Sequence, residues 1–165
     1  MKRSETKADE RGPDEMAAWA PFVLAATQVI GALDTEMKRA FGIGHFDYVL
    51  LWELLRSPRR QARMSDLAGM LRLAPSNITH RVRRLEERGL VVRRAAGDDG
   101  RVVLARLTPK GLHLLRDSRL LVQEGLRRHF LDHIDPTRLE SVADIFSAIA
   151  KSETQPFGED EDRLR

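Results

Sequence analysis

Residues 64–94 read MSDLAGMLRLAPSNITHRVRRLEERGLVVRR, and residues 98–111 read DDGRVVLARLTPKG. Ser65 is expected to cap a short helix, and Pro75 to open a second helix that ends before Gly89. The β-rich runs at 90–94 and 101–108 flank a Gly/Asp turn and predict a hairpin. A short helix, a tight turn, a second helix and a two-stranded hairpin make a winged helix-turn-helix.

Amphipathic helices are expected on both sides of this block. Apolar residues recur at three- and four-residue spacing over 16–40 and 45–57, from Pro109 to about His133, and after Pro136. We expect RRQARM (59–64) to be a basic connector. The predicted fold is mainly α with a small β-hairpin wing, a winged helix-turn-helix inserted between N- and C-terminal dimerisation helices. The expected parts are a disordered segment (1–15), a dimerisation helix (16–44), the winged helix-turn-helix (45–108), C-terminal dimerisation helices (109–151) and an acidic disordered tail (152–165).

The composition limits the class of protein. A chain of 165 residues with 42% hydrophobic residues suffices for one domain with a real core. The charged N-terminus and the lack of a long apolar run predict no signal peptide and no membrane span. The chain has no cysteine, which fits the cytoplasm and excludes disulfides, thiolate metal sites and thiol-based sensing.

Positive charge is concentrated in the middle third of the sequence. Residues 56–110 contain 14 Lys and Arg but 5 Asp and Glu, a local net charge of +9 within a total of +3. All but one of these cations are arginine, whose planar guanidinium suits bidentate contacts with phosphate or guanine. A solvated basic face is the simpler alternative, but the charge coincides with the winged helix-turn-helix, which favours nucleic acid.

Residues 75–88 have the polarity of a helix that reads a major groove. A helical wheel places Ile78, Val82 and Leu85 on one side, where they would anchor the helix. The other side and the flanks carry short hydrogen-bonding or cationic side chains, namely Ser76, Asn77, Thr79, His80, Arg83 and Arg84. An ordinary amphipathic helix would look alike, but it would not explain the preceding short helix and the following hairpin.

The block at 64–111 resembles the MarR family of bacterial transcription regulators. The resemblance rests on the quoted segments, with Asp99 and Arg101 at the wing tip and Leu107, Thr108 and Gly111 after it. It implies a homodimer in which each recognition helix enters a major groove and each Arg101 a minor groove. The residues predicted at the DNA interface are Ser65, Ser76, Asn77, Thr79, His80, Arg83, Arg84, Asp99 and Arg101.

Two positions depart from the family pattern. Ala74 stands where serine is frequent, so the recognition helix loses a capping hydroxyl worth about 1 kcal/mol. His80 stands where arginine is frequent, which puts one common DNA contact in doubt. Asp99 would repel phosphate, so we expect its carboxylate to hold Arg101 in place through a charge-assisted hydrogen bond.

The family resemblance also implies a small aromatic or phenolic effector. Most of the aromatic rings of this chain lie in the first two predicted helices, and core or dimer packing is the simpler explanation for most of them. The predicted ligand-binding residues are Trp19, Phe22, His45, Tyr48 and Trp52, with His45 the foremost candidate.

Other chemistry has little support in the sequence. Asp98 and Asp99 are adjacent in a solvated turn without a neighbouring histidine, and no nucleotide-binding or hydrolase motif occurs. His129 and His133 could share a metal, but surface or interface histidines explain them more simply, so no metal or cofactor is predicted. The expected function is that of a cytoplasmic regulator bound to a pseudo-palindromic double-stranded operator, a repressor relieved by a ligand. The alternative is a winged-helix module for protein–protein contact.

Overall fold

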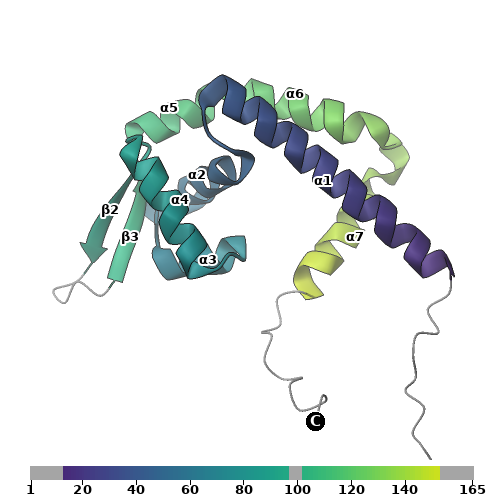
Figure 1. Cartoon of the computed structure of the whole chain (residues 1–165), viewed down its shortest axis with the longest axis horizontal. Helices are drawn as coiled ribbons and strands as arrows, with labels where there is room; N and C mark the ends of the chain where they lie inside the picture. The colour runs from purple at the N-terminus through teal and green to yellow at the C-terminus, as the bar shows by residue number, and fades with distance from the viewer. Residues whose placement is uncertain (1–12, 97–101, 153–165) are drawn as a thin grey trace, which may run out of the picture. The chain divides into compact units, whose positions relative to one another are not determined.

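The computed structural model describes residues 13–96 and 102–152, which form one unit up to Leu126 and a second from Arg127. The protein is mainly helical with a small antiparallel sheet, as predicted (Figure 1). The α-helices are α1 (Pro13–Phe41), α2 (His45–Arg56), α3 (Met64–Leu71), α4 (Pro75–Glu87), α5 (Pro109–Asp117), α6 (Arg119–His129) and α7 (Leu139–Ser152). The strands are β1 (Gln61–Arg63), β2 (Val91–Ala96) and β3 (Val102–Leu107), and short 3₁₀ turns lie at Pro58–Arg60, Leu131–His133 and Pro136–Arg138.

The predicted hairpin is the main part of the sheet. Strand β3 pairs with β2 in antiparallel register, from Val91 opposite Leu107 to Ala96 opposite Val102. On its other edge β3 pairs with β1, where Ala62 lies opposite Ala105. The prediction that 59–64 is only a connector is therefore wrong, because Gln61–Arg63 completes a three-stranded sheet.

The core of the first unit is built from aliphatic residues. Leu50, Leu51 and Leu54 of α2 lie at its centre and are completely buried. Around them pack buried side chains of the neighbouring elements: Leu67 of α3, Ile78, Val82 and Leu85 of α4, Leu90 and Val91 at the start of β2, and Ala105 and Leu107 of β3. Along β3, Ala105 and Leu107 are buried, whereas Val103 is exposed.

The ends of α3 and α4 differ in part from the prediction. Arg63 is the N-cap of α3, so Ser65 lies inside its first turn and donates its hydroxyl to the Asp66 carboxylate at 3.2 Å. Ala74 is the N-cap of α4 and provides no side-chain hydrogen bond, as its methyl group dictates. Gly89 follows α4 with φ +70°, the left-handed conformation expected of a C′ glycine.

The LTPKG segment closes the base of the wing. The Thr108 side chain accepts a hydrogen bond from the Gly111 N–H at 3.0 Å and caps α5, which begins at Pro109. The Thr108 hydroxyl also donates to the Gly89 carbonyl oxygen at 2.7 Å, and the backbone N–H of Thr108 donates to the Leu90 carbonyl at 3.1 Å. The hydroxyl group and the backbone N–H of Thr108 thus join the end of α4, the start of β2 and the start of α5.

The single helix expected from Pro109 to about His133 is divided. A turn at the buried Ser118 separates α5 from α6, and α6 ends at His129. Asp135 caps the short turn before α7, since its carboxylate accepts the Thr137 N–H at 2.9 Å.

Helix α1 has an exposed apolar surface. It begins at Pro13 rather than at residue 16, and Trp19, Phe22 and Leu24 are exposed along it. Residues Ala17–Phe41 are long and apolar enough to cross a membrane by length and composition, a property that the sequence analysis did not detect. Among residues 17–41 of α1, only Leu33 and Met37 are fully buried, and most of the other apolar side chains in this range are exposed in the single chain.

Candidate nucleic-acid interface

Helix α4 presents the predicted polar face. Ile78, Val82 and Leu85 are buried, as expected from the helical wheel. The remaining predicted contacts on this helix, Ser76, Asn77, Thr79, His80, Arg83 and Arg84, are all exposed. The Thr79 hydroxyl donates to the Pro75 carbonyl at 2.9 Å, which leaves its oxygen able to accept a hydrogen bond from a partner. The arrangement fixes one side of α4 to the core and exposes the other.

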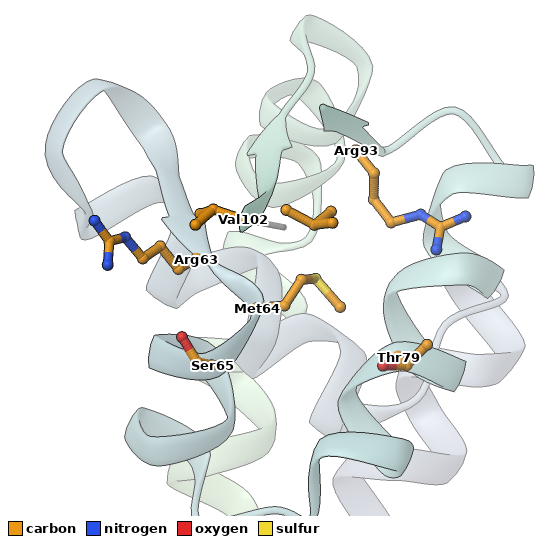
Figure 2. A pocket seen from close by; sticks show the side chains of 7 residues that line it. Arg63, Met64, Ser65, Thr79, Arg93 and Val102 are labelled. Carbon is orange, nitrogen blue, oxygen red and sulfur yellow. The ribbon is translucent and has the colours of Figure 1, made fainter. Parts of the chain in front are cut away.

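A cavity of about 330 Å³ lies between α4, the start of α3 and the sheet. Arg63, Met64 and Ser65 line it from one side, Thr79 from α4, and Arg93, Val102 and Val103 from the sheet (Figure 2). Ser65 and Thr79, both predicted to contact DNA, therefore lie on one concave surface together with two arginines that were not in the predicted set.

Two exposed arginines near this surface have acidic partners on α4. Arg93 donates to the Glu86 carboxylate through both its side chain, at 2.7 Å, and its backbone N–H, at 3.0 Å. The backbone hydrogen bond and the Arg93 charge lower the pKa of Glu86 despite the opposing effect of burial. Arg83 lies 3.1 Å from Glu87, one turn along the helix, in an exposed ion pair that is weak enough to exchange for a phosphate.

A buried carboxylate on α2 holds the opposite flank of α4. Asp47 is 2% exposed, and its two oxygens bind Arg81 at 3.0 Å and Arg84 at 2.5 Å. Asp47 was not among the residues predicted from the sequence. The available signal was its spacing, because Asp47, Leu50, Leu51 and Leu54 form the buried stripe of α2 and an acid on such a stripe needs a partner.

The C-terminal end of α4 is held by a third arginine. Arg88 donates to the carbonyl oxygens of Phe41 at 2.8 Å and Gly42 at 2.6 Å, at the end of α1. This guanidinium thereby satisfies carbonyl groups that have no partner within α1. The predicted wing contacts Asp99 and Arg101 lie outside the described residues. The described part of the candidate interface therefore extends from α3 across α4 to the strands β2 and β3.

The predicted effector residues form two groups of rings. Trp19 lies beside Phe22 on α1, with ring centroids 5.8 Å apart, and Tyr48 stacks on Trp52 within α2 at 6.4 Å. None of the five predicted ligand residues lines the cavity beside α4.

His45 lies at the start of α2 beside Asp34 of α1. Its backbone N–H donates to the Asp34 carboxylate at 2.9 Å, whereas its ring Nδ1 is buried without a hydrogen-bond partner in the described part of the protein. Burial lowers the pKa of His45, and the Asp34 charge offsets part of this effect. A neutral imidazole with a free ring nitrogen can serve a ligand as donor or acceptor. The Lys38 ammonium, 2.6 Å from Asp34, lowers the pKa of that carboxyl.

Metal-binding side chains do not gather in the described residues. No group of three or more His, Asp or Glu suited to a metal ion occurs within 13–96 and 102–152, where His129 and His133 both lie.

Comparison with known proteins gives a consistent result. The MarR family model matches residues 46–103. Sco3205, a MarR family transcriptional regulator from Streptomyces coelicolor solved in complex with DNA, is 31% identical, with 98% of this chain and 100% of that chain covered and a TM-score of 0.85. AbsC, another MarR family regulator from the same organism, is 28% identical over 92% of this chain and 97% of its own, with a TM-score of 0.77.

A more distant structure has the same fold. BpsR from Bordetella bronchiseptica, whose DNA binding is described as regulated by 6-hydroxynicotinic acid, is 15% identical over 81% of this chain and 98% of its own, with a TM-score of 0.72. No curated protein sequence gives a significant match. The resemblance predicted from the sequence is confirmed. The members of the matched family are transcriptional regulators and not enzymes, in agreement with the lack of catalytic motifs in the sequence. This chain belongs to the MarR family of transcriptional regulators.

Proposed function

We propose that this chain is a homodimeric regulator that binds double-stranded DNA and represses transcription. The exposed face of α4 supports this most directly, because its buried stripe fixes the helix while short polar side chains stay accessible near its start. Such side chains reach base edges in a major groove, and Arg83 neutralises a phosphate or binds guanine. The groove-facing residues are Ser76, Asn77, Thr79, His80 and Arg83.

Positive charge supplies the part of the affinity that is independent of sequence. The net charge of +9 over residues 56–110 includes Arg63 and Arg93 beside Ser65 and Thr79 at the cavity. Phosphate contacts from such a surface release counterions, so the affinity falls steeply as salt increases. Arg101 enters the minor groove in this proposal, held by Asp99.

Exposed apolar residues on α1 support a homodimer. Trp19 is 58% exposed and Leu24 59%, and on α7 Ile145 and Phe146 are exposed as well. Contiguous apolar faces of this kind in a monomer mark interaction sites. The match to Sco3205 covers 98% of the chain and so includes α1, which supports a dimerisation helix in a cytoplasmic protein over a membrane span. Two-fold symmetry then requires a pseudo-palindromic operator with half-sites about 34–36 Å apart.

A small aromatic or phenolic acid is the proposed effector. The regulation of BpsR by 6-hydroxynicotinic acid supports an aromatic acid, and the buried unpaired Nδ1 of His45 supplies a polar group at the start of the helix that carries Tyr48 and Trp52. A ligand that prefers a conformation unsuited to DNA lowers the affinity by shifting the population.

Fluorescence anisotropy with labelled DNA tests the DNA-binding function. The probe is the region upstream of the coding sequence, and a scrambled duplex of equal length is the competitor. We expect a complex that resists the scrambled competitor, and we expect Arg83→Ala to weaken it and to reduce the salt slope by about 0.9. Arg116→Ala, the same charge change on an exposed position of α5, is the matched control.

The alternative is a winged-helix module for protein–protein contact. It predicts that no duplex gives a competitor-resistant complex at moderate salt, and that Arg83→Ala and Arg116→Ala behave alike. Such a result would remove DNA from the proposal and leave dimerisation, measured by light scattering, as the remaining property.

Tryptophan fluorescence tests the effector. Both tryptophans of the chain, Trp19 and Trp52, belong to the predicted ligand residues, so 4-hydroxybenzoate should quench emission and dissociate the DNA complex over the same concentration range. His45→Phe should weaken both effects equally. Quenching without dissociation, or dissociation that His45→Phe leaves unchanged, would count against an effector at this place.

A further inference from the structure

The starting observation is a carboxylate shared by two arginines of the candidate recognition helix. Asp47 on α2 binds Arg81 through one oxygen at 3.0 Å and Arg84 through the other at 2.5 Å. Arg81 is further held over the Phe46 ring, with its guanidinium carbon 5.3 Å from the centroid. Neighbouring residues of α2 therefore bind two positions of α4 that lie about one turn apart.

These arginines form a row on one flank of α4, in line with Asn77 at the start of the helix, and the row includes Arg84, which the sequence predicted to contact DNA. Arg81, Arg84 and Arg88 follow a spacing of three and four residues, so they lie along one side of α4. All three are bound to the α1–α2 region, the first two by Asp47 and the third by carbonyl groups of Phe41 and Gly42. Arg83 projects from a different side, and within the described part of the chain its ion pair is with the exposed Glu87.

The burial of Asp47 gives this arrangement its strength. A carboxylate that is 2% exposed loses its hydration and must be compensated by cations with good geometry. The arginine side chains remain more accessible, at 29% for Arg81 and 49% for Arg84. Without the carboxylate, Arg81 would keep its contact with the Phe46 ring, whereas Arg84 would lose the ion pair that holds it to α2 and could turn toward a phosphate.

We propose that Asp47 is a specificity-determining residue of the DNA-binding surface. It acts in two ways: it fixes the orientation in which Ser76, His80 and Arg83 meet the groove, and it withholds Arg81 and Arg84 from phosphates. Arginines that are bound to Asp47 do not contact the phosphates of unrelated DNA, so the ratio of specific to nonspecific affinity is higher than it would be without Asp47. Asp47 is a positioning residue, and this role rests on the DNA-binding function proposed above.

The main experiment compares Asp47→Asn with Asp34→Asn. Both substitutions remove one carboxylate charge near the start of α2, but the partners of Asp34 are Lys38 and the His45 N–H, and neither belongs to α4. For each variant, the affinity for the upstream duplex and for the scrambled duplex is measured over a range of salt concentrations. Circular dichroism and thermal unfolding verify that each variant is folded.

Asp47→Asn should make the salt slope for scrambled DNA steeper by about 0.9 to 1.8, which corresponds to one or two released arginines. The ratio of specific to nonspecific affinity should fall roughly tenfold or more, the size of a lost base contact. Asp34→Asn should change neither quantity. An unchanged slope and ratio in a folded Asp47→Asn variant would overturn the proposal, as would equal effects of the two variants.

A second pair keeps the proposal testable if Asp47→Asn fails to fold. Arg81→Gln leaves Asp47 with Arg84, whereas Arg83→Gln removes an arginine of the DNA-facing side; both remove one charge from the same helix. Arg83→Gln should reduce the salt slope by about 0.9, and Arg81→Gln should lower the specificity ratio with the slope unchanged. A reduced slope and an unchanged ratio for Arg81→Gln would show that Arg81 binds phosphate directly and would overturn the proposal.

The same measurements distinguish an error in the proposed DNA-binding function from an error in the proposed role of Asp47. If the wild-type protein does not distinguish the upstream duplex from the scrambled one, both are wrong. If the wild-type protein distinguishes them and the Asp47 and Arg81 variants keep the wild-type ratio, only the role of Asp47 is wrong.

Discussion

Replacing Gly111 by alanine places a methyl group against the base of the wing. The added carbon would collide with the Leu90 carbonyl oxygen and lie 2.7 Å from a methyl group of Leu107. The Leu90 carbonyl cannot retreat freely, because it accepts hydrogen bonds at 3.1 Å from both the Thr108 N–H and the Thr108 hydroxyl. Relief of the clash must therefore strain the junction of β2, β3 and α5.

The size of the effect follows from opposing contributions. Overpacking of a tight site destabilises by about 1–3 kcal/mol, and weakening one neutral hydrogen bond adds about 0.5–1.5 kcal/mol. Alanine recovers about 0.5–1 kcal/mol over glycine through the entropy of the helical backbone. The expected net destabilisation of Gly111→Ala is thus about 1–3 kcal/mol. Gly69→Ala in α3 is the matched control, because the added carbon has no neighbour within 4 Å, and it should stabilise by about 0.5–1 kcal/mol.

Urea unfolding followed by circular dichroism measures both variants. All samples need the same protein concentration, because dimerisation makes the apparent stability depend on concentration. The midpoint of unfolding should move down for Gly111→Ala and up for Gly69→Ala. A Gly111→Ala variant as stable as the wild type, or shifts of the same sign in both variants, would refute the close approach at the wing base.

Three further predictions concern stability. Ala74→Ser should stabilise the protein by about 1 kcal/mol in urea unfolding, because Ala74 occupies the N-cap position, with φ −56° and ψ 142°, but has no capping side chain; no gain would mean that the start of α4 is fixed by other contacts. Glu86→Gln should lose the stabilisation from Arg93. Since the pKa of Glu86 is lowered from 4.5, the variant should have a lower free energy of unfolding than the wild type at neutral pH, and this difference should vanish as the pH falls through the lowered pKa. A difference that does not depend on pH would contradict this. The pKa of His45 is lowered from 6.5, so the unfolded chain takes up the proton first and wild-type stability relative to His45→Gln should decrease as the pH falls below 6.5; a constant difference would show that His45 is not desolvated.

The parts of the fold set by local patterns were predictable from the sequence. The apolar spacing of Ile78, Val82 and Leu85 identified the buried side of α4, and Gly89 identified its end. Thr108 followed by Pro109 marked the start of α5, where the capping hydrogen bond is present. These features depend on residues within one or two turns of each other, which a single sequence displays directly.

The features that were missed depend on distant partners or on small local differences. Strand β1 has three residues and exists through its pairing with β3, more than 40 positions away. The contacts of Asp47 reach 34 and 37 positions along the chain, so only its place on a buried stripe hinted at them. The N-cap of α3 was predicted two residues too late, at Ser65, because the observed N-cap Arg63 has an extended backbone conformation but no capping side chain that the sequence could reveal.

A footprint on DNA tests the central claim most directly. Hydroxyl-radical protection of the upstream region should show two equivalent half-sites about one helical turn apart. Missing-base interference within each half-site should weaken when His80 is replaced by alanine, and it should stay unchanged in the Arg116→Ala control. Such a pattern would assign base contacts to the exposed face of α4. Protection without two-fold symmetry, or interference that His80→Ala leaves intact at every base, would contradict the account.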